Sequence, residues 1–340
     1  MIRQLARTAK SGLATILELT GTLDLILDRK LAGRVAVIMY HRVIADHVAR
    51  QTDSNPGIIV SKGQFEQQMA TIREEFNPLS LNEFQSHVEN ETAPPRRSCL
   101  ITFDDGWIDN YEIAFPILRK YSIPAVIFLP CDYISTDRTF WQEEMLMRLT
   151  RMLSSGNGDA QKALGEILAS RDNGFERTID GIRLFVISMK HESQGEIESL
   201  LEEIRLASEH CVDGKHYNKH LTWEQVRDMQ DAGVTFASHA LSHRLLTTLD
   251  PEERRRELET SQRVLEKMLG HPVSAIAYPN GDFDEGVLRS TREAGYTLGF
   301  STEHGVFEIG NDPLAIPRFN LHDRNGGTRA RFMCTIGGIL

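Results

Sequence analysis

Short apolar runs alternate with amphipathic stretches along most of the 340 residues of the chain. In the amphipathic stretches apolar residues recur at helical spacing, and the pairs Ser61 with Gln64 and Thr222 with Gln225 predict capped helix starts. The apolar runs that predict buried strands are 34–41, 99–105, 125–130, 234–239, 273–279, 296–301 and 314–321. Repeated strand–helix units of this kind predict a parallel α/β fold, either an open sheet or a barrel.

Two segments depart from this alternation. Residues 138–219 are rich in Glu, Lys, Arg and Ser and carry leucines at helical spacing, which predicts a helical insertion between two core strands. Residues 1–33 predict short helices, because their apolar positions fall on one face. The expected organisation is an N-terminal helical segment over 1–33, a core over 34–137 and 220–340, and a helical insertion over 138–219.

The N-terminal helices leave two arrangements open. They can pack on the body of the protein, which we favour, or lie in a membrane interface with Arg3, Arg7 and Lys10 beside them. No signal-peptide cleavage site is evident, and no stretch reaches the roughly 18 apolar residues of a membrane span. We expect a cytoplasmic protein, with peripheral association at the inner membrane face as the alternative.

Composition narrows the classes of function. The formal net charge is −10 and the isoelectric point is about 5.7, so we expect no nucleic-acid partner, because such a partner requires a basic surface. The four cysteines form no Cys-x-x-Cys pair, so neither a zinc knuckle nor a disulfide framework is indicated.

Polar residues gather directly after the predicted strands. These residues are His41, Asp104, Asp105, His239, His243, Asn280, Asp282 and those from Arg318 to His322. In parallel α/β folds the C-terminal ends of the strands lie on one face, where active sites form. The pattern therefore predicts a single polar site at that face.

The residue types within this group indicate a metal site. His239 and His243 are four residues apart, so on a helical turn both imidazoles would face one ion. A carboxylate can supply a third ligand and leave a position open for water, as in catalytic zinc sites. One member of the Asp104–Asp105 pair would then bind the cation, while the other stays free as a base.

Several motifs resemble those of a known family. The stretches "TFDDG" (102–106), "SHALSH" (238–243) and "AYPNG" (277–281) look like motifs of the polysaccharide deacetylases, the NodB-homology carbohydrate esterases. The stretches "VIMYHRV" (37–43), "SKGQFEQQM" (61–69) and "PLSLNEF" (78–84) are similar to a bacterial branch of that family. The resemblance covers about 35–135 and 220–322. It implies a distorted (β/α)7 barrel and a metal-dependent hydrolase that removes N- or O-acetyl groups from glycans.

The resemblance also implies roles for single residues. The metal ligands would be Asp105, His239 and His243, and the divalent ion would most often be Zn²⁺. Asp104 would be the catalytic base. The backbone N–H of Asn280 would stabilise the oxyanion.

Two departures from the family pattern affect these roles. The family's third motif often has an arginine where this chain has Ala277, and we expect Arg318 to contact the base instead. The last motif is commonly Leu-x-His, which "NLHD" (320–323) matches loosely. His322 is nevertheless the best match for the acid that protonates the leaving amine.

Four residues are expected to contact the substrate: His41, Trp107, Tyr278 and Asn280. His41 is also a second candidate for the catalytic acid, and a structural role for it is equally open.

Three functions compete. The leading hypothesis is a deacetylase acting on an N-acetylated glycan or a lipid-linked sugar of a bacterial surface polysaccharide, glycolipid or precursor. The alternatives are a non-catalytic carbohydrate-binding or assembly protein on an esterase-like barrel, and a metal-dependent amidase with a non-sugar substrate.

Overall fold

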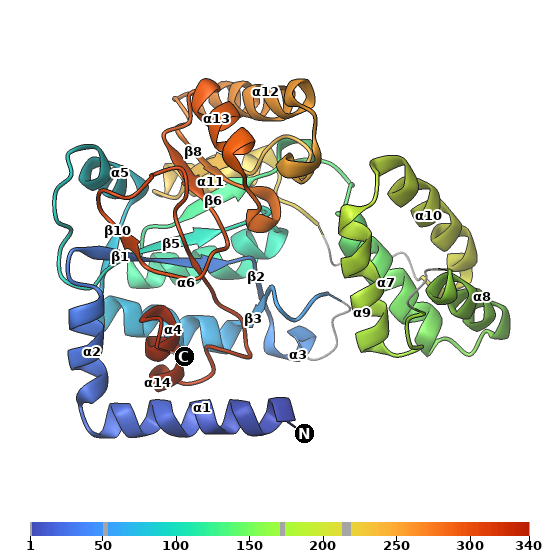
Figure 1. Ribbon diagram of the computed structural model, residues 1–340, viewed down its shortest axis with the longest axis horizontal. Helices are drawn as coiled ribbons and strands as arrows, with labels where there is room; N and C mark the ends of the chain where they lie inside the picture. The colour runs from blue at the N-terminus through green and yellow to red at the C-terminus, as the bar shows by residue number, and fades with distance from the viewer. Residues whose placement is uncertain (1, 50–53, 171–173, 213–218, 340) are drawn as a thin grey trace. The chain divides into compact units, whose positions relative to one another are not determined.

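The computed structural model describes residues 2–49, 54–170, 174–212 and 219–339 (Figure 1). The chain divides into two compact units. The first comprises Met1–Arg50, Gly57–Thr136 and His220–Leu340, and the second comprises Gln51–Pro56 and Asp137–Lys219.

A curled, mainly parallel sheet forms the centre of the first unit. Within the described residues its parallel strands run in the order β11 (Phe319–Asn320), β1 (Arg34–Tyr40), β5 (Ser98–Phe103), β6 (Val126–Leu129), β7 (Thr235–Ser238), β8 (Ala275–Ala277) and β9 (Leu298–Phe300). The short strand β4 (Asn77–Leu79) also pairs with β5, and β10 (Phe307–Glu308) pairs antiparallel with β1. A separate pair consists of β2 (Arg42–Ile44) and β3 (Ile59–Ser61).

The segment Ile316–Asn320 brings the two ends of this sheet together. Ile316 pairs in parallel with Phe300 of β9, and four residues later Asn320 pairs with Met39 of β1. A short and mostly irregular segment thus takes the place of a full strand at the closure. The predicted distorted (β/α)7 barrel is confirmed.

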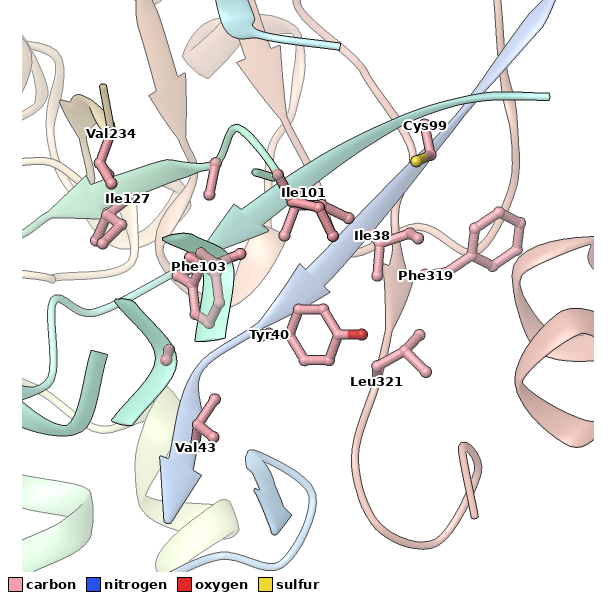
Figure 2. Packing of buried hydrophobic residues seen from close by; sticks show 14 of the residues in the cluster. Ile38, Tyr40, Val43, Cys99, Ile101, Phe103, Ile127, Val234, Phe319 and Leu321 are labelled. Carbon is pink, nitrogen blue, oxygen red and sulfur yellow. The ribbon is translucent and has the colours of Figure 1, made fainter. Parts of the chain in front are cut away.

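Side chains of the barrel strands alternate between two apolar cores, as the two-residue period of a strand requires. Val37 and Leu100 belong to one core, whereas Ile38 and Ile101 belong to the other, which lies against the surrounding helices. Figure 2 shows part of this second core, where side chains from β1 and β5 lie beside those of the closing segment. Continuing the alternation past β5 puts Asp104 on the same side as Leu100.

Helices surround the sheet of the first unit. Those that follow β1 in the chain are α3 (Asp46–Ala49), α4 (Lys62–Glu75), α5 (Leu81–Glu89), α6 (Phe115–Tyr121), α11 (Trp223–Asp231), α12 (Pro251–Leu269), α13 (Glu285–Glu293) and α14 (Arg329–Ile336). Thr222 forms the predicted capping box with Gln225. The capping box expected at Ser61 is absent, because the Ser61 hydroxyl and N–H both donate to the carboxylate of Asp323.

The N-terminal helices α1 (Ile2–Leu19) and α2 (Thr22–Lys30) belong to the first unit and contact α14 (Figure 1). Ala14 is buried in the core that faces the helices, and Glu18 pairs with Arg329. Leu13 and Ile16 are exposed. The helices pack on the protein body, and association with a membrane interface stays a prediction. None of the helices in the described ranges combines the length and apolar character needed to cross a membrane.

The second unit has an apolar core of its own. Its helices are α7 (Trp141–Ser154), α8 (Gly158–Ala169), α9 (Ile179–Ser188) and α10 (Gln194–Ala207). Leu149, Leu164 and Phe185 are fully buried in this core, which includes only residues of the second unit. Glu144 of α7 also binds Arg205 of α10, with an Nη2–Oε2 distance of 2.7 Å.

Truncating this core should destabilise the second unit. Leu164→Ala removes a fully buried side chain, so we expect a loss of about 2–5 kcal/mol from the unfolding free energy. Hydrogen–deuterium exchange should rise in peptides of 141–207. The matched control is Leu184→Ala, whose side chain is 58% exposed and which should change little. An equal loss from both variants would contradict the assignment of this core.

Candidate metal centre

Asp105 lies one residue beyond Asp104 at the C-terminal end of β5, in a turn with a left-handed φ of 75°. One carboxylate oxygen, Oδ2, accepts a hydrogen bond of 2.9 Å from Nε1 of Trp107. The other oxygen, Oδ1, faces two imidazoles, at 3.4 Å from Nε2 of His239 and 3.3 Å from Nε2 of His243. The Trp107 bond thus fixes which oxygen points toward the histidines.

The two histidines come from the turn that follows β7. Nδ1 of His239 donates to the carbonyl oxygen of Ala277 at 2.7 Å, which fixes the ring so that its other nitrogen, Nε2, faces Asp105. His243 lies four residues later with a φ of 60°. The spacing predicted a shared ligand site on a helical turn, whereas the rings converge from a non-helical turn that includes a second left-handed residue, Ala240.

These three side chains fit a divalent cation. Two ligand atoms of a tetrahedral zinc ion, each about 2.0–2.1 Å from the metal, lie about 3.3 Å apart. The distances from Asp105 Oδ1 to the two imidazole nitrogens, 3.3 and 3.4 Å, match this value. All three ligand atoms lie within 4.8 Å of one another. One carboxylate and two imidazoles would leave a coordination position open to water.

The charges of the site already compensate one another. Burial raises the pKa of Asp105, but hydrogen bonds from His239 and His243 outweigh it and hold the pKa well below its usual range. Burial lowers the pKa of His239, but its contacts with the aspartates outweigh this and the net pKa is raised. These two shifts favour a negative charge on Asp105 and a positive charge on His239, so the contact between them is electrostatically favourable.

Asp104 has a different partner. Its two carboxylate oxygens accept hydrogen bonds of 2.7 Å each from Nη1 and Nη2 of Arg318. Arg318 is 1% exposed, and its Nε donates to the carbonyl oxygen of Ser301 at 2.7 Å. Burial raises the pKa of Asp104, but the guanidinium outweighs it and the net pKa is lowered. The structure thus places Arg318 against Asp104, as expected from the absence of an arginine at Ala277.

Paired with Arg318, the Asp104 carboxylate can still accept a hydrogen bond from another donor, such as a water molecule. Each carboxylate oxygen has two lone pairs, and the guanidinium occupies one on each side. The fixed pair also sets the direction of the remaining lone pairs, because a bidentate contact restricts rotation of the carboxylate. This geometry agrees with a base, and the role remains a prediction.

Two of the residues expected to contact substrate are buried. Trp107 is 0% exposed, stacks on His220 at 4.5 Å, and has the Arg42 guanidinium 4.7 Å from its ring centre. Tyr278 is also 0% exposed, and its hydroxyl donates to the carbonyl oxygen of Leu314. Trp107 contacts Asp105 through its Nε1, and Tyr278 packs within the barrel. Their contact with a substrate stays a prediction, against which their burial argues.

The other expected residues lie at the same end of the barrel. His41 follows β1, and its Nδ1 is buried without a hydrogen-bond partner among the described residues. Asn280 is exposed, with a left-handed φ of 61°. His322 follows β11, and its Nδ1 accepts from the N–H of Arg324, so a neutral ring carries its proton on Nε2. Their roles remain predictions.

The support beneath Trp107 was not predicted from the sequence. Arg42, whose guanidinium lies over that ring, pairs with Asp109 at 2.9 Å, and both side chains are buried. Asp109 also accepts from the N–H of Val43. A sequence signal existed, because Arg42 follows His41 and Asp109 lies four residues after Asp105. Asp109 was not predicted as a site residue, because only polar residues directly after a strand were considered.

The two points of the first unit between which residues 137–219 are inserted lie beside Asp105 in the barrel. The N–H of Leu221 donates to the carbonyl oxygen of Gly106 at 2.8 Å, and Leu221 in turn accepts from the N–H of Ser135. The chain leaves the first unit after Thr136 and returns at His220. The departure and return points therefore lie next to the turn that carries the candidate ligand.

The sequence can be compared with known families and proteins. The model of the polysaccharide deacetylase family matches residues 91–158 and 186–299, which is just over half of the chain. YxkH of Bacillus subtilis strain 168, provisionally named a polysaccharide deacetylase, is 23% identical over 297 residues, or 87% of this chain and 74% of that protein. Poly-β-1,6-N-acetyl-D-glucosamine N-deacetylase of Staphylococcus aureus is 34% identical over 100 residues, or 28% of this chain and 34% of that protein.

Solved structures show the same fold. The deacetylase PplD of Streptococcus pyogenes, in complex with acetate, has a TM-score of 0.59 at 20% identity, with 89% of this chain and 98% of that chain covered. IcaB of Ammonifex degensii has a TM-score of 0.58 at 16% identity, with 88% and 97% covered. The chain belongs to the polysaccharide deacetylase family, the NodB-homology hydrolases with a (β/α)-barrel fold.

Proposed function

We propose that this protein is a metal-dependent deacetylase that hydrolyses the N-acetyl groups of amino sugars in a bacterial surface polysaccharide, glycolipid or precursor. The observation that carries the proposal is the convergence of Asp105, His239 and His243 beside an Arg318-bound Asp104. The name of the Staphylococcus aureus relative supports an N-acetylated amino sugar as the substrate class. The metal that we propose is Zn²⁺, because the donor set and spacing suit it.

The protein side chains have distinct tasks in this proposal. When bound, a divalent ion supplies a Lewis acid that polarises the acetyl carbonyl and makes a nearby water more acidic. Asp104 takes a proton from that water as its oxygen attacks the carbonyl carbon, and Arg318 holds Asp104 in position. His322 donates a proton to the leaving nitrogen as the C–N bond breaks, which yields acetate and a free amine.

The Asp104–Arg318 pair also bears on the non-catalytic alternative. Ala277 stands where the family often has an arginine, and the absence of that arginine would suit a barrel without catalytic activity. Arg318 makes the contact from another segment, so the loss at Ala277 is compensated within the barrel. This compensation favours an enzyme over a binding protein.

Acetate release across a panel of N-acetylated glycans and lipid-linked precursors tests the function. We expect release from at least one N-acetylated amino-sugar polymer. Asp104→Asn keeps the shape of the side chain but cannot take the proton, so release should fall by roughly 10²–10⁴-fold. Unchanged turnover by Asp104→Asn would refute the mechanism, and no release from any substrate would refute the proposed reaction.

Metal content should separate the two aspartates. Asp105→Asn weakens a proposed ligand, so we expect metal occupancy and activity to fall together, with partial recovery in excess Zn²⁺. Asp104→Asn should keep its metal while losing turnover. Elemental analysis of both variants measures the difference, with the exposed Asp231→Asn as the control for loss of a carboxylate. The opposite pattern, in which only Asp104→Asn loses metal, would show that the roles are reversed.

We also propose that the second unit shapes access for a large or lipid-linked acceptor. The supporting observation lies within the first unit, where Ser135 and Leu221, which flank the inserted residues in the chain, lie beside Gly106, next to Asp105. Replacing 138–219 by a short linker should leave Zn²⁺ binding and hydrolysis of a small acetylated sugar intact, while hydrolysis of a polymer falls. Loss of metal binding by a folded deletion would instead mean that 138–219 helps to build the site.

A further inference from the structure

Glu257 of α12 makes unusual contacts for a buried carboxylate. It is 7% exposed, and its Oε2 accepts hydrogen bonds from the backbone N–H groups of Leu241 at 3.0 Å and Ser242 at 2.8 Å. Its Oε1 accepts from the hydroxyl of Ser242. All three donors belong to the turn between His239 and His243. Glu257 therefore binds the chain that separates two proposed metal ligands.

The opposite side of the same turn is also held. The carbonyl oxygens of Ala240 and Leu241 accept from the N–H groups of Cys131 and Asp132, at 3.4 and 2.9 Å. The N–H of Ala240 donates to the hydroxyl of Ser238 at 3.1 Å and not to Glu257. Ser238, at the end of β7, accepts from Ala240, and Glu257 accepts from the next two N–H groups, those of Leu241 and Ser242.

The turn needs this support because its backbone is strained. Ala240 and His243 have φ values of 61° and 60°, in the left-handed region that residues with a side chain rarely adopt. Such conformations persist where surrounding contacts determine them. The conformation at His243 helps to bring its Nε2 to 3.3 Å from Asp105 Oδ1.

We propose that Glu257 is a positioning residue for the metal centre, holding the His239–His243 turn so that both imidazoles face Asp105. This inference rests on the proposed metal-dependent function. It assigns to Glu257 no contact with metal or substrate. The side chain of Glu257 is long enough for its oxygen to accept hydrogen bonds from two backbone N–H groups. We expect these hydrogen bonds to position the turn more than the negative charge of the carboxylate does.

Two substitutions separate reach from charge. Glu257→Gln keeps the reach, since its carbonyl oxygen can accept from both amides and its NH2 can donate to the Ser242 hydroxyl. Glu257→Asp keeps the charge but is one methylene too short. The matched control is Glu259→Gln, which removes a carboxylate from the same helix at a position paired with the exposed Arg255.

Calorimetric titration of the chelator-treated full-length protein with Zn²⁺ measures the effect. We expect Glu257→Asp to weaken Zn²⁺ binding by about 10–100-fold, the range typical for residues that orient metal ligands. Glu257→Gln and Glu259→Gln should remain close to the unmodified protein. Glu257→Ala, a second variant without reach, should match Glu257→Asp. Unchanged affinity in the variants that lack reach, or loss in Glu257→Gln alone, would overturn the inference.

Hydrogen–deuterium exchange of the metal-free protein gives a readout that does not depend on metal. Exchange in the peptide containing Leu241 and Ser242 should rise in Glu257→Asp and stay low in Glu257→Gln. If the unmodified protein binds no Zn²⁺, the proposed function fails, and the role of Glu257 at a metal centre fails with it. If it binds Zn²⁺ but Glu257→Asp changes neither exchange nor affinity, only the inference about Glu257 fails.

Discussion

Two adjacent carboxylates enter the same end of the barrel, and the site depends on giving each a different partner. Side by side, Asp104 and Asp105 repel each other, and burial makes both charges costly. Arg318 compensates Asp104, while His239 and His243 compensate Asp105. Because the partners come from different segments, the carboxylates differ in chemistry. Asp104 is paired with a guanidinium that is always charged, whereas Asp105 faces two imidazoles that can bind either a proton or a metal ion.

This division of partners couples the site to closure of the barrel. Arg318 lies within Ile316–Asn320, the short segment that joins β9 to β1. Breaking a buried ion pair by removing one partner typically costs about 3–5 kcal/mol, because the other charge stays buried and unpaired. Separation of this segment from the barrel would leave Asp104 in that state. The same contact therefore orients the proposed base and stabilises the closure.

Two kinds of feature were predictable from the sequence: the strands and helices themselves, and the polar residues at the C-terminal ends of the parallel strands. Apolar runs predicted β1 and β5, and the rule that parallel strands end on one face predicted that the Asp104–Asp105 pair lies near His239 and His243. The family resemblance then implied that Asp105 is the ligand. The resemblance to a family added the distorted barrel. Even Arg318 was assigned to Asp104, because the absent arginine at Ala277 implied a substitute.

Features that depend on contacts between distant segments were not predicted. Trp107 was expected to contact the substrate, and nothing in the sequence indicated that it stacks on His220 and donates to Asp105 as a buried side chain. Ser61 does not form the predicted capping box, because it donates instead to Asp323, which lies 262 residues away in the chain. No local pattern distinguishes Glu257 from the other acidic residues of α12, since its role arises only where α12 meets the turn after β7.

The central claim is that Asp105 binds the metal while Asp104 remains outside its coordination sphere. Anomalous X-ray diffraction at the zinc edge, from crystals of the full-length protein grown with Zn²⁺, tests it directly. The account predicts one ion about 2.0–2.2 Å from Asp105 Oδ1, His239 Nε2 and His243 Nε2, with Asp104 still paired to Arg318. An ion coordinated by Asp104, or bound away from these three residues, would contradict it.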